Sequence, residues 1–388
     1  MTGRAIPIVA YHSVADDHDH PLSLLSLPVR SFERQLRHLR RRGFQTLTLY
    51  DVHDYLKRGT AVPAKSVVLT FDDGYLDNWV FAFPLLKKYG MKASIFVITD
   101  FVEEVACRPT LEDVWEGRAD ERELEWWGYA SWPELERMQK SGLVDVQSHT
   151  RTHTWYGVSD KIVDFHHPGD PHYWLFWNRF PAEKSRWLTM DVDSRVPWGT
   201  PVYEYAQTLL RPRYSEDEEV ARFASDHVSG NGGREFFLRP GWKEELGSAV
   251  ERFRAKRRSN GTYESQTAYE ARISDELAGS KRIIEQRLGK SVDFLCWPCG
   301  EYTEKLQRFA LDSGYLSTVV VKRTTNRRGD DPSELRRIVF GQDYKGPFKS
   351  TLIHMHFCGN VNFHSGTMGM FFLAPVARRL MMLGNLLR

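Results

Sequence analysis

The sequence predicts a single α/β barrel that carries a long insertion, and three observations support this prediction. Strand and helix patterns alternate through residues 1–150 and again after residue 268. Repeated units of this kind form a parallel sheet with helices on its outside. The stretch from Trp155 to Thr267 breaks the alternation and is rich in Trp, Tyr, His, Pro and charge. The length of 388 residues fits one large barrel as well as two or three domains of about 150 residues.

Before the insertion, apolar runs alternate with amphipathic stretches that end in glycine. Ser66 to Asp72 has the β-branched density of a buried parallel strand. Asn78 to Gly90 is amphipathic and has a cationic last turn, which predicts a helix. The other strands are expected at Ile6 to His12, Thr46 to Leu49, Ala93 to Thr99 and Val144 to Ser148. The other helices are expected at Phe32 to Gly43, Val52 to Gly59 and, behind a serine cap, Ser131 to Gly142.

Regular patterns resume after the insertion, which itself contains a helix pattern near Ser215 to Gly230. Helices are expected at Ala268 to Gly289 and Tyr302 to Gly314, and strands at Val292 to Trp297 and Ser317 to Val321. We therefore expect a first part of the barrel at 1–153, an insertion at 154–267, and the rest of the barrel with an amphipathic C-terminal segment at 268–388.

Composition and charge exclude several classes of protein. Lys and Arg number 53 against 51 Asp and Glu, which gives a formal charge of +2 without a long block of one sign. A nucleic-acid-binding protein would usually show a basic stripe, so we expect no nucleic-acid partner. Four cysteines in a chain of this length do not form a disulfide scaffold.

The two ends of the sequence bear on localisation. The first residues form no apolar h-region, so we expect no signal peptide and a cytoplasmic protein. No apolar run reaches the roughly 18 residues that a spanning helix needs. Met368 to Leu387 comes nearest, but Pro375 and the pair Arg378-Arg379 interrupt it. That segment fits either a helix lying on a membrane surface or a helix packed on the body of the protein.

The first candidate site is Thr70 to Gly74 (TFDDG), at the carboxyl end of an expected strand. Active sites of parallel α/β folds are built at that end. Adjacent carboxylates after an apolar strand are costly unless they are used, so one of Asp72 and Asp73 is expected to bind a metal while its neighbour acts as a base. An Asp-Asp-Gly turn or helix cap without chemistry is the alternative.

The second candidate site is the pair His149 and His153, which follows another expected strand at the same edge. Histidines four residues apart on a helical turn share a face, as metal-ligand pairs often do. With one aspartate they form a His₂-carboxylate set, which suits a catalytic Zn²⁺ and, in related sites, Fe, Co or Ni. Histidines that are satisfied by hydrogen bonds alone are the alternative.

The third candidate site is Cys296 to Gly300, where a strand runs into a turn. The C-x-x-C spacing of Cys296 and Cys299 matches a thioredoxin-like redox pair. No compact thioredoxin-sized domain surrounds it, and the simpler interpretation is two small apolar residues on either side of a Trp-Pro turn.

Together, the three sites resemble the motifs of the polysaccharide deacetylase family, the NodB-homology carbohydrate esterases. T-F-D-D-G matches at Thr70 to Gly74, H-[ST]-x-x-H at His149 to His153, and R-x-P-x-G in part at Cys296 to Gly300. The resemblance covers Ile6 to His153 and Ala268 to Val321. It implies a distorted (β/α) barrel of the NodB-homology type and a metal-dependent hydrolase that removes acetyl groups from sugars.

The resemblance also implies roles for the matching residues. Asp72 would be the general base, and the backbone N–H near Cys299 would help to form the oxyanion hole. Pro298 and Trp297 would lie beside it at the substrate. The metal ligands, most simply for Zn²⁺, would be Asp73, His149 and His153.

Two features depart from the family motifs. Cys296 stands where the motif has the arginine that orients the base, so another cation, such as Arg151, would replace it. The family's late motif ends in a histidine that protonates the leaving amine. Here the candidates are His354 and His356, on one face of an expected strand, and a surface strand with two polar residues is the alternative. His12 ends the first strand and is expected at the same edge, as a substrate contact or in a supporting role.

The insertion leaves the barrel directly after His153, so we expect it to cover the mouth of the active site. Its aromatic side chains suit either sugar rings or a small core of their own. They include Trp155, Tyr156, Tyr173, Trp174, Trp177 and Trp187.

The sequence thus predicts a metal-dependent deacetylase that acts on an N-acetylated sugar in a polysaccharide or a lipid-linked glycan precursor. The expected partners are this glycan and, through the C-terminal segment, a membrane surface, and no protein partner can be inferred. Two alternatives remain open. One is a sugar-binding protein that keeps the barrel without catalysis, which Cys296 and the undefined acid would favour. The other is a redox enzyme that uses Cys296 and Cys299.

Overall fold

The computed structural model describes residues 5–16, 25–191, 193–257, 261–322, 324–339, 348–364 and 372–386. The chain divides into two compact units. The first unit comprises Met1–Arg151, Leu277–Gly300 and Gln307–Arg388, and the second comprises Thr152–Glu276 and Glu301–Leu306.

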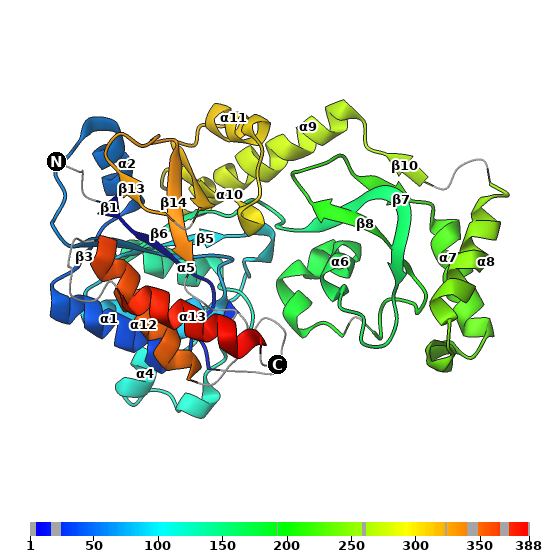
Figure 1. Cartoon of the computed structure of the whole chain (residues 1–388), viewed down its shortest axis with the longest axis horizontal. Coiled ribbons are helices and arrows are strands. Elements are labelled where there is room, and N and C mark those ends of the chain that lie inside the picture. The colour runs from blue at the N-terminus through cyan, green and yellow to red at the C-terminus, as the bar shows by residue number, and fades with distance from the viewer. Residues whose placement is uncertain are drawn as a thin grey trace. The chain divides into compact units, whose positions relative to one another are not determined.

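In the described part of the first unit, seven parallel strands close into a barrel (Figure 1). Pairing of β2 with β4 closes the ring, and β3 (Gln45–Thr46) pairs with the first residues of β4. This arrangement confirms the predicted distorted (β/α) barrel. Around the ring the strands are β2 (Ile8–Tyr11), β14 (Glu334–Val339), β12 (Ser317–Val321), β11 (Phe294–Cys296), β6 (Val144–Ser148), β5 (Ala93–Val97) and β4 (Ser66–Phe71).

Helices connect these strands and cover the barrel. Most begin and end within a few residues of the predicted positions, because caps and glycines mark their ends. Ser131 caps one helix, and Gly43 ends another at a φ of 71°. They are α1 (Val29–Arg42), α2 (Leu49–Arg58), α3 (Phe83–Tyr89), α4 (Leu111–Trp115), α5 (Trp132–Lys140), α10 (Ser280–Leu288) and α11 (Glu304–Asp312).

Apolar side chains form a buried cluster inside the barrel. Residues of α2 pack against the same cluster, so this helix helps to bury it. Arg337 follows Leu335 by two residues on β14, so its side chain points to the same face as that core residue. The strand residues of the cluster are Ile8, Val68, Phe96, Phe294, Cys296, Val319 and Leu335.

The helix α5, which leads into β6, is held by a buried ion pair. Arg108 donates from Nε to Oε1 of Glu134 and from Nη2 to Oε2, both at 2.9 Å. The side chain of Glu134 is fully buried, and its Oε2 also accepts from the backbone N–H of Ser131 at 2.7 Å. This carboxylate therefore ties the start of α5 to the Arg108 loop.

Replacing Arg108 by methionine is expected to lower the free energy of unfolding by about 3–5 kcal/mol, because it leaves the Glu134 carboxylate buried and without its cation. Urea denaturation measures this loss. Arg118→Met is the matched control, since that side chain is 57% exposed beside Asp113, and it is expected to cost less than about 1 kcal/mol. Equal losses in the two variants would contradict the prediction.

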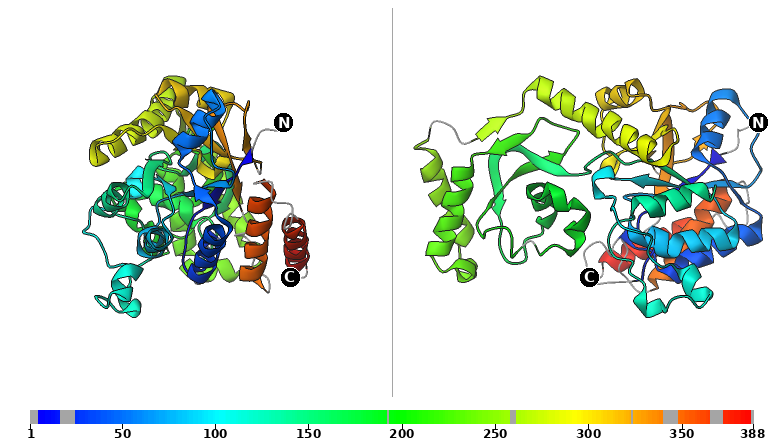
Figure 2. Two further views of the ribbon diagram at one scale, coloured as in Figure 1. Left: turned by 90° about the vertical axis from the view of Figure 1, so that its left-hand side faces the viewer. Right: turned by 180° about the vertical axis from the view of Figure 1, so that it is seen from behind.

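The segment with His354 and His356 is part of helix α12 (Lys349–His364), which corrects the strand expected there. The buried side chains of α12 recur every three or four residues, as in a helix. The six residues around the two histidines alone show an alternation that a strand or a helix can produce. The helices α1, α12 and α13 (Leu373–Leu386) lie side by side (Figure 2). The buried apolar residues of α12 are Leu352, Ile353, Phe357, Cys358 and Val361.

One face of α13 packs on α12, where Ala377 and Met381 contact Leu352. For this face of α13, the expectation of a C-terminal helix packed on the body of the protein is therefore confirmed. The ends of the predicted segment, 368–371 and 387, lie outside the described residues. Within the described ranges, no helix is both long and apolar enough to cross a bilayer. Attachment to a membrane surface stays a prediction. The exposed apolar side chains next to this face are Phe372, Val376, Leu380, Met382 and Leu383.

The second unit has its own core, in which Phe165 packs with helices α7 and α8. The predicted helix near Ser215 is α7, and Trp187 is buried within this unit. That this unit covers the mouth of the active site stays a prediction. Its elements are β7 (Trp155–Phe165), α6 (Tyr173–Phe176), β8 (Pro201–Gln207), β9 (Tyr214–Glu216), α7 (Glu218–Gly230), α8 (Trp242–Arg254), β10 (Gly261–Tyr263) and α9 (Gln266–Ser274).

Candidate active site

The strands of the barrel bring the predicted site residues together at their carboxyl ends. Asp72 and Asp73 follow β4, His149 follows β6, and Cys296 is the last residue of β11. All four are buried. His12 follows β2 and is partly exposed. The carboxyl edge of a parallel barrel is where the sequence predicted a site.

The three predicted metal ligands each place one ligand atom within 4.8 Å of the others, and they are Asp73, His149 and His153. Oδ1 of Asp73 lies 3.3 Å from Nε2 of His149. Nδ1 of the same ring lies 2.9 Å from the carbonyl oxygen of Cys296. A carbonyl at Nδ1 fixes the ring and its tautomer, and leaves Nε2 for a metal. The donor set therefore fits a His₂-carboxylate site for Zn²⁺ or a similar ion.

The backbone of the ligand loops is strained. Asp73, Thr150 and His153 have φ angles of 70°, 69° and 41°, in the left-handed region that non-glycine residues rarely adopt. Gly74 shares this region, and a Cβ atom there would lie 3.1 Å from Val97. Such strain persists only where surrounding contacts impose it, and it concentrates at functional sites.

Side-chain hydrogen bonds hold the histidine loop in this conformation. Ser280 donates from Oγ to the carbonyl oxygen of Thr150 at 3.1 Å, and Ser148 accepts from the backbone N–H of Thr150 at 3.2 Å. In the second unit, Glu276 accepts from the backbone N–H of Thr152 at 2.9 Å. Three polar side chains thus fix the residues between the two histidines.

Sequence reasoning missed the cation that holds the expected base, which is Arg337 of β14. Its Nη1 donates to Oδ1 of Asp72 at 2.6 Å and its Nη2 to Oδ2 at 2.7 Å. Nη2 also lies 2.9 Å from the sulfur of Cys296. The small cysteine stands where the family motif has arginine, and β14 supplies the guanidinium instead. Arg151, the substitute considered from sequence, pairs with Asp100.

The surroundings of Asp72 keep it ionised. Burial raises its pKa, but the charge and the two hydrogen bonds of Arg337 outweigh burial and hold the pKa below its ordinary value. The pKa of His149 is shifted in the opposite direction. Burial lowers this pKa, but interactions with the neighbouring Cys296 and Asp73 outweigh the effect of burial and raise the pKa well above its ordinary value. A metal would have to displace that proton, so metal affinity should rise with pH.

His12 and the turn after β11 complete the rim. Nε2 of His12 lies 3.8 Å from Oδ2 of Asp72, and its side chain is 21% exposed. Cys299 has a φ of 56° in the turn Pro298–Gly300, and its side chain is exposed. Trp297 is 0% exposed. The expectation that Trp297 lies at the substrate is therefore corrected, since its side chain is buried in the core.

The structure places the two candidate acids elsewhere. His354 lies on α12 against Cys358 and faces the ring of His38 from α1. His356, on the same outer helix, lines a hollow with residues of α13. This placement corrects the expectation that either histidine reaches Asp72, because both were assigned to a strand that is a helix.

The redox alternative for Cys296 and Cys299 also loses support. The thiol of Cys296 is buried and that of Cys299 is exposed. Burial raises the pKa of the Cys296 thiol, aided by Asp72 and opposed by Arg337. Redox-active thiols usually have lowered pKa values, because the thiolate is the reactive form.

With this geometry established, comparison with known proteins gives the family. Residues 59–222 match the family model for polysaccharide deacetylases. These residues therefore resemble polysaccharide deacetylases. The chain also resembles YxkH of Bacillus subtilis (strain 168), a protein named only provisionally as a polysaccharide deacetylase, with 42% identity over 93 residues. It also resembles the poly-beta-1,6-N-acetyl-D-glucosamine N-deacetylase of Escherichia coli (strain K12), with 26% identity over 150 residues.

These matches span limited parts of each protein. They cover 24% of this chain and 32% of YxkH, and 39% of this chain and 21% of the Escherichia coli enzyme. The chain thus spans a third or less of these two curated relatives.

Solved structures share the fold of this chain. A de-N-acetylase from Aggregatibacter actinomycetemcomitans superposes with a TM-score of 0.54 at 16% identity, covering 90% of this chain and 99% of that one. The BpsB deacetylase domain from Bordetella bronchiseptica gives a TM-score of 0.50 at 17% identity, covering 87% and 96%. At these identities the likeness confirms the barrel fold.

Proposed function

We propose that this protein is a metal-dependent hydrolase that removes an acetyl group from an N-acetylated sugar of a polysaccharide. One observation carries the proposal. A buried carboxylate that Arg337 keeps ionised, Asp72, is the sequence neighbour of the metal ligand Asp73 in the His₂-carboxylate set. A base beside a metal site is what hydrolysis by activated water requires. The names of the curated relatives support poly-β-1,6-N-acetylglucosamine as the first substrate to test.

Asp73, His149 and His153 would hold the metal. When Zn²⁺ is bound there, it lowers the pKa of a water in its open position and polarises the acetyl carbonyl. Co, Ni or Fe would suit the same donor set.

The other residues of the rim would move protons and stabilise charge. Asp72 would take the proton of the attacking water, and Arg337 would hold its carboxylate in one orientation. The backbone N–H at Cys299, in its left-handed turn, would donate to the oxygen that becomes negative. His12, beside Asp72 and partly exposed, would protonate the leaving amine in place of His354 or His356. Acetate and a free amine would be the products.

A direct test uses β-1,6-linked N-acetylglucosamine oligomers, with β-1,4-linked oligomers as a comparison, and measures acetate. The metal-loaded protein should release acetate, and His149→Ala should release none while losing about one equivalent of bound metal. Metal binding and sugar binding without acetate release from either series would instead support the sugar-binding alternative.

We also propose that the enzyme works at a membrane surface through the exposed face of α13. Arg378 and Arg379 stand on this helix among its exposed apolar side chains, a composition that suits an interfacial helix. Co-sedimentation with anionic vesicles, weakened in Leu380→Glu, tests this attachment. Equal sedimentation of parent and variant would argue against it.

A further inference from the structure

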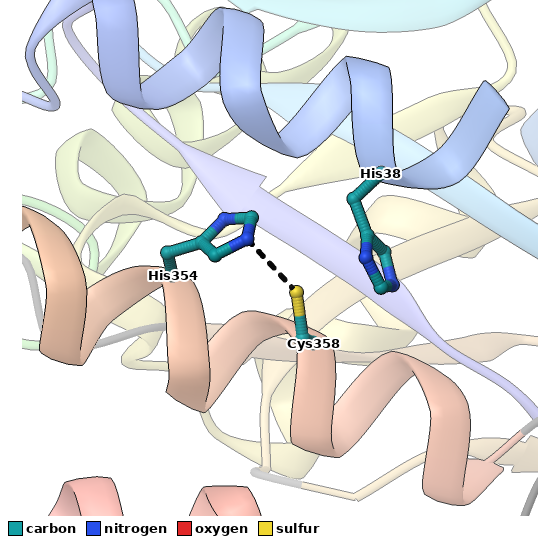
Figure 3. Close-up of side chains that lie close together, drawn as sticks. All are labelled: His38, His354 and Cys358. Carbon is teal, nitrogen blue, oxygen red and sulfur yellow. Dashed lines mark hydrogen bonds between the residues drawn. The ribbon is translucent and has the colours of Figure 1, made fainter. Parts of the chain in front are cut away.

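The described part of the first unit holds a second group of metal-ligand side chains, which the proposed deacetylation does not use. His38 stands on α1, and His354 and Cys358 stand on α12. One ligand atom from each lies within 4.8 Å of the other two. Figure 3 shows the three side chains pointing toward one another between the two helices.

Helix geometry determines how these residues meet. His354 and Cys358 are four residues apart on α12, so they share one face of the helix. Nε2 of His354 lies 3.4 Å from the sulfur of Cys358. The ring of His38 approaches from α1, with its centroid 5.9 Å from that of His354 and its plane nearly perpendicular. Ligands on packed helices are held more rigidly than ligands on loops.

Neighbouring contacts support the cluster. Cys358 is 1% exposed. Nε2 of His38 lies 3.0 Å from Nδ2 of Asn362, which also donates to the carbonyl oxygen of Cys358 at 2.7 Å. The amide nitrogen donates in both contacts, so Nε2 of His38 accepts, and the ring is held in place beside Cys358.

The donor chemistry selects a class of ion. Two imidazoles and one thiolate suit Zn²⁺ and similar transition ions, and do not suit Mg²⁺ or Ca²⁺, which take oxygen ligands. Arginines line the hollow beside His38 and His354, among them Arg34 and Arg42. Their positive charge opposes a cation, so the negative thiolate of Cys358 is essential for binding. Three protein ligands leave one tetrahedral position to water or a small anion.

We propose that His38, His354 and Cys358 form a second transition-metal site, separate from the deacetylase site, which ties α12 to α1. The site is independent of the proposed function, because it lies on outer helices and shares no ligand with Asp73, His149 and His153. Its signature is a metal–sulfur bond, which the three ligands of the deacetylase site would not form.

The experiment titrates the metal-free full chain with Co²⁺ and records the near-ultraviolet thiolate-to-cobalt charge-transfer absorption. The parent and His149→Ala should both show this absorption, saturating at about one equivalent of thiolate-bound cobalt. Cys358→Ser should lose the absorption and keep acetate release. His354→Gln is the second variant, should Cys358→Ser fail to fold by circular dichroism, and should also lose it.

Cys296→Ser is the matched control, because Cys296 is the other buried cysteine near metal-ligand side chains, beside Asp72 and His149. It should keep the absorption. Absence of the absorption in the folded parent would overturn the proposal. So would absorption that persists in Cys358→Ser or His354→Gln and disappears in Cys296→Ser, because the sulfur ligand would then belong to the deacetylase site.

Discussion

Asp72→Asn is expected to lower kcat for acetate release by about 10²–10⁴-fold, the usual contribution of a general base. An asparagine keeps the shape of the side chain and can still accept a hydrogen bond from Arg337, but it cannot take a proton at neutral pH. KM should change little, because Asp72 is not one of the three proposed metal ligands. Steady-state kinetics with elemental analysis of bound metal measures both effects.

Asp77→Asn provides a matched control for this experiment. Asp77 is buried like Asp72 and accepts from Ser13 Oγ and the backbone N–H of Val14. Burial raises its pKa to about 6, although these hydrogen bonds lower it, so Asp77 is mostly ionised at neutral pH and its replacement removes a buried charge, as the replacement of Asp72 does. This variant should keep most of the activity. An Asp72→Asn enzyme as active as Asp77→Asn would show that another group is the base.

Arg337→Met is expected to shift the pH dependence of the reaction. Without the guanidinium, burial dominates and the pKa of Asp72 rises. The limb of kcat/KM that increases with pH should therefore move to higher pH, and activity at neutral pH should fall. A pH profile in the parent and the variant measures the shift, and an unchanged acid limb would rule out this role for Arg337.

The same variant should be less stable at neutral pH, by about 3–5 kcal/mol, because a buried carboxylate loses its partner. In the parent, the depressed pKa of Asp72 contributes stability that is present at neutral pH and is lost as the pH falls through the folded-state pKa. In the variant the pKa is raised, so the deficit should shrink on acidification. Arg336→Met is the control, since Arg336 is partly exposed and pairs with Glu334 and Asp330.

Much of the site could be predicted because it depends on local sequence. Val144–Ser148 and Ser317–Val321 form strands with the predicted bounds, since β-branched runs between turns identify buried strands. Asp72, Asp73, His149 and His153 follow such strands directly, so the rule that parallel strands share a carboxyl edge was enough to group them.

The remaining features depend on contacts that no local pattern describes. Arg337 is 265 residues from Asp72 in sequence, and its role follows only from closure of the ring through β14 and β2. In the sequence, the only local indication of this role is that Arg337 stands two residues after Leu335 on a short strand. That spacing would place its charge on the face of the strand that points into the barrel. His354 and His356 were misplaced because six residues cannot distinguish a period of 2 from one of 3.6.

The ion pair between Asp72 and Arg337 would also set the time at which the proposed enzyme could begin to work during its synthesis. The two aspartates and the two histidines proposed as metal ligands leave the ribosome with the first 153 residues, long before β14. Until residues 334–339 emerge and join the ring, Asp72 has no guanidinium beside it, and its burial would favour the neutral acid. A nascent or truncated chain that ends before β14 would carry every expected metal ligand and still lack a working base.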